Sequence, residues 1–389
     1  MTGLGAVTPV GVGTDRLWSA LCDARSAFSA IDPVYPGMKP DFMTARLSGQ
    51  DRAEVAGQVA EAVGRDLPDS SLFAVHAALQ AIRDAGLSPG EPALRGALVC
   101  VGNNEAEADL LDELVDGQDS RWRGSVYSSY AVARNVATAI GSGGPAFTVH
   151  NTCASGNVAL EIALRMLRSG AIETAVVGGG DVFSKKVWTG FNTLGALGPE
   201  RCLPFSARRR YITIAEGAAF LVLRTHRTPP AGHEAYAELL AAASNNDAVH
   251  PTNPDPGGVL ACHRRVMDQA RLPDSAIDGI FAHGTGTRAN DAVEAAIFTE
   301  RFPTASVSAV KGTVGHLMAS AGALGAVASC LAIRHQLLPP TNIDPAEFEY
   351  GFDLVMEGGG RRRELVHVLN NAFGFGGNNA IALFKAVGR

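Results

Sequence analysis

One cysteine stands between a strand-forming run and a helix-forming run, in the stretch VHNTCASGNVAL of residues 149–160. If Cys153 lies in the first turn of the helix that follows, the positive end of the helix dipole favours its thiolate form. A thiolate is a strong nucleophile, whereas a free thiol with an ordinary pKa near ~8.5 is weak at neutral pH. A small buried side chain that fills a gap between helix and sheet is the alternative, and this stretch alone leaves both interpretations open.

Two histidines stand where a ligand could reach them. His283 ends an apolar run and precedes the GTGT of residues 284–287, at the expected carboxyl end of a strand, where open α/β sheets bind ligands. His316 follows Lys311 across a glycine turn at the start of a long helix. The helix N-terminus and the ammonium both disfavour imidazolium, so we expect a neutral His316 that donates a hydrogen bond from Nε2. A purely structural histidine and a solvated lysine are the alternatives.

The stretch NAFGFGGNN of residues 371–379 predicts a loop. Gly374, Gly376 and Gly377 permit backbone conformations closed to other residues, and Phe373 and Phe375 stand between them. Taken by itself this pattern is weak evidence of a site, because most such loops are only turns.

Short β-rich runs that alternate with alanine-rich helical runs must position these residues. Their continuous apolar character indicates sheets covered on both faces. Residues 146–169 and 306–335 each combine a strand with a long helix of small residues, which suggests an internal duplication. We therefore predict an α/β protein of two similar halves, residues 1–230 and 231–389. The runs predicted as strands are residues 95–102, 145–150, 174–180, 218–224, 278–284, 306–310, 365–371 and 380–385.

Composition excludes several classes of protein. The chain has 389 residues, 46% of them hydrophobic, with a net charge of -6 and no basic block, so a nucleic-acid partner is not expected. Six cysteines without CxxC spacing argue against disulfides and structural zinc and fit a reducing cytoplasm. The N-terminus lacks the pattern of a signal peptide, and the longest apolar run, residues 318–333, is shorter than the roughly 20 residues of a membrane span. We expect a cytoplasmic protein with no membrane partner.

Together and in this order, the motifs resemble those of the β-ketoacyl-(acyl carrier protein) synthases, the thiolase-fold condensing enzymes of fatty acid and type II polyketide synthesis. The resemblance covers nearly the whole chain and includes TGLGAVTPVG (2–11), GGGDVFSKKVWTGFNTLGALGP (178–199), PFSARRRYITIAEGAAFLVL (204–223) and NDAVHPTNPDPGG (246–258). It implies a thiolase-like fold, in which two duplicated βαβαβ-type halves form a layered α-β-α-β-α arrangement. It also implies a decarboxylative Claisen condensation of an acyl thioester with malonyl-carrier protein.

The resemblance assigns roles by position. Cys153 looks like the nucleophile that takes the acyl chain, and His283 and His316 look like the pair that stabilises the enolate of malonyl-carrier, with Lys311 orienting His316. Preorganised donors are what an enolate oxygen in a dry pocket requires. The backbone N–H groups of Cys153 and Phe375 would form an oxyanion hole.

Other residues are implied to bind and gate the substrate. Phe375 would gate the acyl pocket, within a loop that also holds Phe373, Gly374 and Gly376. Thr285 and Thr287 would contact the phosphopantetheine arm of the carrier, which is substrate, so that no permanently bound cofactor is expected. A zinc ion on Cys153, His283 and His316 is the rival for the same side chains, disfavoured because Lys311 would repel a dication.

The chain departs from the family pattern at three places. Gly325 replaces an acidic residue that usually pairs with the lysine, so Lys311 is expected to lean on Asp291 or Glu294 instead, or to be displaced. The residues 208–211, Arg-Arg-Arg-Tyr, replace an Arg-Asp-Gly turn, and Asn378 replaces a threonine near the active site.

These departures open a second class of function, the non-condensing chain-length factors that pair with an active synthase. Such subunits usually lack the cysteine, so Cys153 favours an enzyme. Both interpretations predict a dimer, homodimeric or heterodimeric with a paralogous subunit, with the region of residues 103–150 in its interface. Because carrier proteins are acidic, we expect a basic docking surface. Its candidates are Arg121, Arg123, Arg208, Arg209 and Arg210, with Lys185 and Lys186 in reserve.

Overall fold

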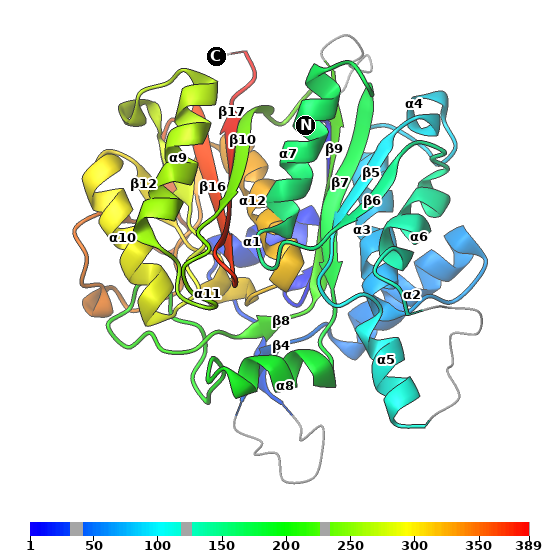
Figure 1. Ribbon diagram of the computed structural model, residues 1–389, viewed down its shortest axis with the longest axis horizontal. Helices are drawn as coiled ribbons and strands as arrows, with labels where there is room; N and C mark the ends of the chain where they lie inside the picture. The colour runs from blue at the N-terminus through cyan, green and yellow to red at the C-terminus, as the bar shows by residue number, and fades with distance from the viewer. Residues whose placement is uncertain (32–41, 118–126, 226–233, 389) are drawn as a thin grey trace.

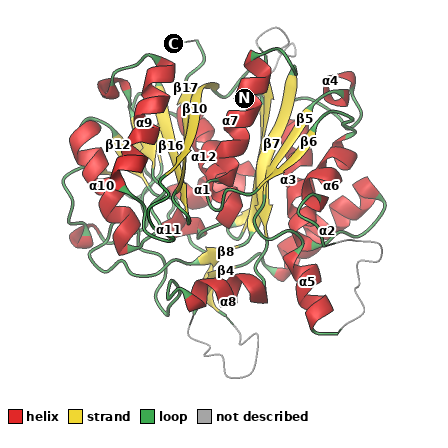
Figure 2. Ribbon diagram, viewed as in Figure 1, coloured by secondary structure: helices red, strands yellow, loops and turns green. Residues whose placement is uncertain are grey.

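Two mixed β-sheets form the framework of the protein (Figures 1 and 2). The structure is a computed structural model that describes residues 1–31, 42–117, 127–225 and 234–388. The predicted boundary at residues 230 and 231 lies outside the described residues, so the division into two halves at that point stays a prediction.

The first sheet is built from residues before 225. Its strands are β1 (Gly3–Thr8), β2 (Gly11–Val12), β5 (Leu98–Gly102), β6 (Ala146–Val149), β7 (Thr174–Asp181) and β9 (Gly217–Arg224), in the order β2-β1-β9-β7-β5-β6. β5, β6 and β7 are parallel, whereas β9 is antiparallel to both of its neighbours, β1 and β7. β7 is buried along its whole length, as expected of a strand covered on both faces.

The second sheet repeats this topology. Its strands are β10 (Glu238–Asn246), β11 (Gly279–Phe281), β12 (Ser306–Ser308), β14 (Asp353–Leu354), β16 (His367–Gly374) and β17 (Asn378–Lys385), in the order β10-β17-β16-β11-β12-β14. β10, β17, β16, β11 and β12 correspond in chain order, spatial order and direction to β1, β9, β7, β5 and β6. The thiolase-like α/β fold and its internal duplication are therefore confirmed.

Helices form three layers around the two sheets (Figure 2). α3 (Asp69–Asp84) and α6 (Ala131–Ile140) cover the outer face of the first sheet, and α9 (Pro256–Ala270) covers that of the second beside α10 (Arg288–Arg301). α7 (Ser155–Arg168) and α12 (Ala321–His335) pack against each other between the sheets. The predicted echo of residues 146–169 in residues 306–335 is this pair of central helices.

The remaining elements are short or peripheral. They are the helices α1 (Thr14–Cys22), α2 (Gly49–Val63), α4 (Pro92–Arg95), α5 (Ala108–Val115), α8 (Lys185–Thr193) and α11 (Lys311–Val314), the small sheets of β3 (Phe28–Ala30), β4 (Met43–Ala45) and β8 (Ile214–Ala215) and of β13 (Leu337–Leu338) and β15 (Arg361–Arg362), and the 3-10 helices Asp274–Ala276, Met318–Ser320 and Pro345–Glu347. No helix in the described ranges is both long enough and apolar enough to cross a membrane.

The two central helices touch backbone to backbone. A Cβ added at Gly156 would lie 2.5 Å from the backbone nitrogen of Ala323, and one added at Gly322 would lie 2.8 Å from that of Asn157. The Asn157 amide then ties α7 to the second sheet by donating to the carbonyls of Asn370 and Ala380 at 2.9 and 3.0 Å. This contact fixes the relation between the two halves.

The departure at Gly325 has a packing reason. A Cβ at this position would lie 2.1 Å from Oδ1 of Asn370, whose amide donates to Asn157 Oδ1 at 2.9 Å and to the Gly322 carbonyl at 2.8 Å. The Asn370 side chain therefore fills the space beside position 325, and a larger residue there would displace it.

Candidate active site

The chemistry-bearing residues all follow the carboxyl ends of strands. Cys153 follows β6, His283 follows β11, and Lys311 and His316 follow β12. Since β6 and β12 hold the same place in the two sheets, the duplication sets Cys153 and His316 on equivalent turns. The glycine loop joins β16 to β17 next to them.

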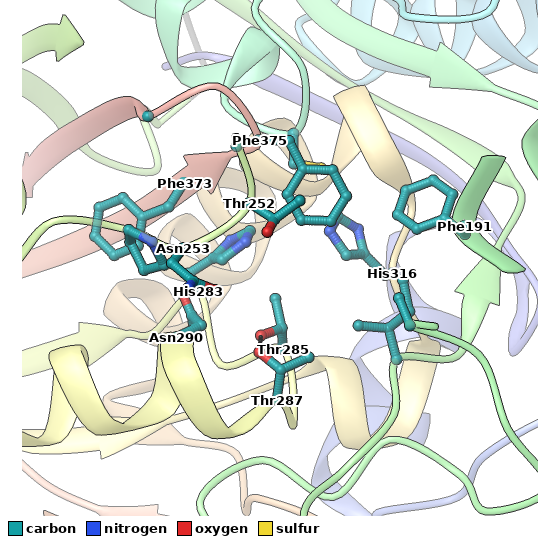
Figure 3. A pocket seen from close by; sticks show the side chains of 16 residues that line it. Phe191, Thr252, Asn253, His283, Thr285, Thr287, Asn290, His316, Phe373 and Phe375 are labelled. Atoms are coloured by element: carbon teal, nitrogen blue, oxygen red, sulfur yellow. Dashed lines mark hydrogen bonds between the residues drawn. The ribbon is translucent and has the colours of Figure 1, made fainter. Parts of the chain in front are cut away.

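A pocket of ≈ 560 Å³ receives most of the predicted site residues (Figure 3). Cys153, His283 and His316 line one and the same cavity. Lys311, Gly376 and Asn378 do not line it; Lys311 lies behind His283, and the other two belong to the loop that covers the cavity. Its lining residues are Cys153, Phe191, Ala196, Ile212, Thr252, Asn253, Pro254, His283, Thr285, Thr287, Asn290, His316, Phe373, Gly374, Phe375 and Gly377.

Cys153 occupies a strained turn ahead of its helix. The backbone of Thr152 has φ 50°, in the left-handed region that β-branched residues rarely adopt. α7 begins at Ser155 with Ala154 as N-cap, so Cys153 precedes the first turn and does not belong to it, as the sequence had suggested. The side chain is only 6% exposed.

The thiol of Cys153 is protonated at rest. Burial raises its pKa to about 12, and the positive charge of Lys311 opposes this shift without overcoming it. The expectation of a thiolate stabilised by the helix dipole is therefore wrong, because desolvation outweighs the dipole at a site outside the first turn.

His316 is a neutral hydrogen-bond donor, as expected. Its Nδ1 accepts the backbone N–H of Met318 at 3.0 Å, which leaves the proton on Nε2. Burial, and secondly the charge of Lys311, hold its pKa well below the ordinary value.

Lys311 orients His283, not His316 as expected. Its ammonium lies 3.3 Å from His283 Nδ1 and also donates to the His283 carbonyl oxygen. An ammonium donor at Nδ1 again places the ring proton on Nε2. Burial and Lys311 hold the pKa of His283 well below its ordinary value. The two rings stand at 85° with their centroids 5.5 Å apart, so both present Nε2–H donors to one cavity.

Glu294 and Asp291 support the backbone and do not pair with Lys311. The Glu294 carboxylate accepts the N–H groups of His283 at 2.9 Å and Gly284 at 2.7 Å, and the Asn290 amide at 3.0 Å. Burial raises its pKa, and these donors oppose the rise. Asp291 accepts the Phe205 N–H at 2.7 Å. The expected lysine partner is therefore replaced by the imidazole and carbonyl of His283.

The glycine loop is in van der Waals contact with the nucleophile turn. A Cβ at Gly374 would lie 1.8 Å from Thr152 Oγ1 and 2.9 Å from the backbone nitrogen of Cys153. The Phe375 carbonyl accepts Thr152 Oγ1 at 3.1 Å and the Asn378 amide at 2.8 Å. Asn378 thus still reaches the active-site threonine, with its Nδ2 3.4 Å from Thr152 Oγ1.

Two side chains of the pocket escaped the sequence prediction. The Phe191 ring lies against that of Phe375 with centroids 5.7 Å apart, on the opposite side of the cavity from His283 (Figure 3). Thr252 lies above His283 in the same view and belongs to the loop after β10. Both fall within stretches that carry the family resemblance, at residues 178–199 and 246–258, and that position was the only available signal.

The candidates for a basic docking surface are largely neutralised within the chain. Arg208 pairs with Glu347 at 3.0 Å and Arg209 with Glu349 at 2.6 Å, and the guanidinium of Arg210 lies over the Tyr211 ring. The reserve residues Lys185 and Lys186 pair with Asp116 and Glu105. Arg121 and Arg123 lie outside the described residues.

Thr285 and Thr287 face the cavity together. Their hydroxyls share a hydrogen bond of 2.8 Å, on the same turn as His283 (Figure 3). Across the described ranges, no three His, Cys, Asp or Glu side chains are arranged to hold a metal ion.

Comparison with known proteins identifies the family of this fold and site. The beta-ketoacyl synthase N-terminal domain matches residues 1–228, and the beta-ketoacyl synthase C-terminal domain matches residues 236–343. The chain therefore belongs to the β-ketoacyl synthase family, the condensing enzymes of fatty acid and polyketide synthesis.

Similar proteins cover the chain almost from end to end. Nodulation protein E of Rhizobium meliloti (strain 1021) is 32% identical over 408 residues, which are 100% of this chain and 98% of that protein. The putative polyketide beta-ketoacyl synthase 1 of Streptomyces halstedii is 31% identical, over 97% of this chain and 95% of that protein. Among solved structures, the ishigamide ketosynthase/chain length factor superposes with a TM-score of 0.87 at 29% identity, over 100% of this chain and 98% of that one.

Proposed function

We propose that this protein is a 3-oxoacyl-(acyl carrier protein) synthase of the Cys-His-His type. The observation that carries the proposal is that Cys153, His283 and His316 line one cavity, with both imidazoles fixed as Nε2–H donors. A nucleophile and two neutral donors in a dry pocket are what acyl transfer followed by enolate formation requires.

In the first step, the Cys153 sulfur attacks the carbonyl carbon of an acyl thioester on the carrier. The C–S bond to the pantetheine sulfur breaks, and the thiol proton of Cys153 leaves with the departing pantetheine thiol. Because the resting thiol is protonated, this proton is lost only when the acyl thioester has entered the pocket.

In the second step, malonyl-carrier binds with its thioester oxygen between the Nε2–H groups of His283 and His316. The bond to the carboxylate breaks and carbon dioxide leaves, so that its electron pair forms the enolate. The two hydrogen bonds strengthen as charge develops on the oxygen, which lowers the barrier. Neutral rings suit this role because they neither titrate nor take up the proton that the new carbanion equivalent would need.

In the third step, the enolate carbon attacks the thioester of acylated Cys153, and the tetrahedral oxyanion is held by the backbone N–H groups of Cys153 and Phe375. The close contact of Gly374 with the Cys153 nitrogen supports this pairing, since it brings residue 375 beside the nucleophile. Collapse of the intermediate expels the cysteine sulfur, which is reprotonated, and releases the 3-oxoacyl carrier.

The substrate arrives on a phosphopantetheine arm. Thr285 and Thr287, which line the cavity beside His283, would bond to the amides of that arm. A solved relative with a TM-score of 0.83 at 25% identity is titled as a type II acyl-carrier protein in complex with its ketosynthase, which supports a carrier protein as partner here. Arg210 and the loop of residues 118–126 are the parts of the predicted docking surface that remain to be tested.

Intact mass measured after incubation with acyl-carrier protein tests the proposal directly. We expect an acyl adduct on the wild type and none on Cys153→Ala. His316→Ala should still accept the acyl group yet lose malonyl-carrier decarboxylation, because only the second step uses its donor.

A non-condensing partner subunit is the competing function, named by the chain length factor of the ishigamide relative. Absence of an adduct on the wild type, together with stable association of a paralogous synthase in native mass spectrometry, would support that function instead.

A further inference from the structure

A buried aspartate joins the two turns that carry Cys153 and His316. Asp181, the last residue of β7, is fully buried and does not line the pocket. Its Oδ2 accepts the Ala319 N–H at 2.8 Å, and its Oδ1 accepts the Asn103 side-chain amide and the Asn104 N–H, both at 3.0 Å. Burial, with the nearby Glu105 carboxylate, raises the pKa of Asp181 to about 8, and the donors oppose that rise. Since these partners all donate, the ionised carboxylate is the form that satisfies them.

On one side, this carboxylate holds the turn that sets the tautomer of His316. Ala319 belongs to the 3-10 turn Met318–Ser320, whose Met318 N–H donates to His316 Nδ1. Met318 has φ 49°, a left-handed conformation that costs a non-glycine residue about 1–3 kcal/mol unless its surroundings hold it. The bond from Asp181 to the next residue is such a constraint.

On the other side, the same carboxylate reaches the nucleophile turn through residues 103 and 104. The Asn103 N–H donates to the Val149 carbonyl at the end of β6. Asn104 Oδ1 lies 3.4 Å from the Ser155 hydroxyl, which itself accepts the Asn151 N–H at 2.8 Å. One carboxylate thus spans the edge at which the two halves meet.

We infer that Asp181 is a positioning residue, which fixes His316 as an Nε2–H donor through the Ala319 and Met318 backbone and holds that turn in register with the Cys153 turn. This inference rests on the proposed function for its effect on rate, but its effect on the His316 ring is independent of it. An asparagine at position 181 keeps the size of the side chain and turns one acceptor into a donor that faces another donor.

The test compares Asp181→Asn with the wild type in two assays and one spectrum. We expect decarboxylation of malonyl-carrier to fall by roughly 10- to 100-fold, the range typical of lost supporting contacts. Acylation of Cys153 by acyl-carrier, measured on the same folded fraction, should fall less than roughly 3-fold, because it does not use His316. In ¹⁵N-histidine spectra assigned with His316→Ala, the His316 ring should change from the Nε2–H tautomer to a mixture.

Glu107→Gln is the matched control. Glu107 is a buried carboxyl of the same half that bonds to Ser71 and contacts neither turn of the site. It should lower the melting temperature without separating the two rates. If Asp181→Asn fails to fold, Asn103→Ala removes a single donor and should give a smaller split in the same direction.

Equal loss of both rates, or an unchanged His316 spectrum in Asp181→Asn, would overturn the inference. If the wild type itself fails to decarboxylate malonyl-carrier, the proposed function is wrong, and a tautomer change in Asp181→Asn would still uphold the positioning role.

Discussion

At the scale of the residue, the protonation states of three side chains decide the chemistry. The thiol of Cys153 is held neutral by burial, while the rings of His283 and His316 are held neutral by burial and by Lys311. Each group with an ordinary pKa near neutrality, or within reach of it, is thereby moved out of the physiological range. The active site is prepared for charge that appears only during the reaction.

The raised pKa of Cys153 predicts how its alkylation depends on pH. For a group with a pKa of about 12, the thiolate fraction grows about tenfold with each pH unit far below that value. The rate of iodoacetamide labelling at Cys153, followed by peptide mass spectrometry, should therefore rise without a plateau between about pH 6.5 and 9.5. A plateau near neutral pH would contradict the protonated resting state, and peptides that contain Cys22 provide an internal comparison.

Residue types announced the nucleophile and both histidines, but not their contacts. That Lys311 bonds to His283 depends on how the turns after β11 and β12 approach each other, which lies beyond any local pattern. Likewise, the exchange of an acid for Gly325 makes sense only beside Asn370, a residue 45 positions away along the chain. Asp181 gave no signal at all, since its role rests on donors from three separate segments.

At the scale of the element, the close approach of α7 and α12 is the most restrictive contact. Gly156→Ala would bring a methyl group within 2.5 Å of the Ala323 backbone nitrogen, and the helices would have to separate. We expect a loss of about 1–3 kcal/mol in the free energy of unfolding, measured in urea. Gly57→Ala, at an exposed position of α2 with open space around it, should instead gain up to about 1 kcal/mol. Equal stabilities for the two variants would contradict the contact.

The loop between β16 and β17 predicts a loss of function without a loss of fold. Gly374→Ala would place a methyl group on Thr152 Oγ1 and against the Cys153 nitrogen, so the loop must move away from the nucleophile. We expect acylation of Cys153 to fall by at least roughly 100-fold, the cost of removing an oxyanion donor. Gly358→Ala, in open space, is the control, and an unchanged circular dichroism spectrum of both variants excludes unfolding.

The apolar runs predicted eight strands of the two sheets, because buried strands of both halves are rich in β-branched and small residues. β10 was missed for a physical reason. Its sequence, ELLAAASNN, favours a helix by local propensity, and only its pairing with β17 makes it a strand. The start of α7 was placed two residues early, since the strained turn at Thr152 leaves no pattern in the sequence.

At the scale of the whole molecule, β6 leaves one edge of the first sheet open. Phe147 on this strand is 44% exposed and Tyr130, at the N-terminus of α6, is 49% exposed, within the region predicted to form a dimer interface. An open edge with exposed aromatic side chains is suited to pairing with another chain.

Phe147→Asp should therefore weaken self-association. A charge on the open strand must be desolvated in any interface that covers it, so we expect a shift from dimer to monomer at micromolar concentration in native mass spectrometry. Val387→Asp alters a similarly exposed apolar side chain near the C-terminus and should leave the oligomeric state unchanged. A Phe147→Asp protein that stays dimeric would place the interface elsewhere.

The bare crossing of α7 and α12 at Gly156 and Gly322 also limits how such a protein can change its product. No side chain separates the helices there, so no repacking can widen the gap between nucleophile and donors. Space for a longer or bulkier chain has to come from the rim of the cavity, where Phe191, Ile212 and Thr252 lie on separate loops. The bond-forming machinery is thus held constant by the seam, and the identity of what is built is left to its periphery.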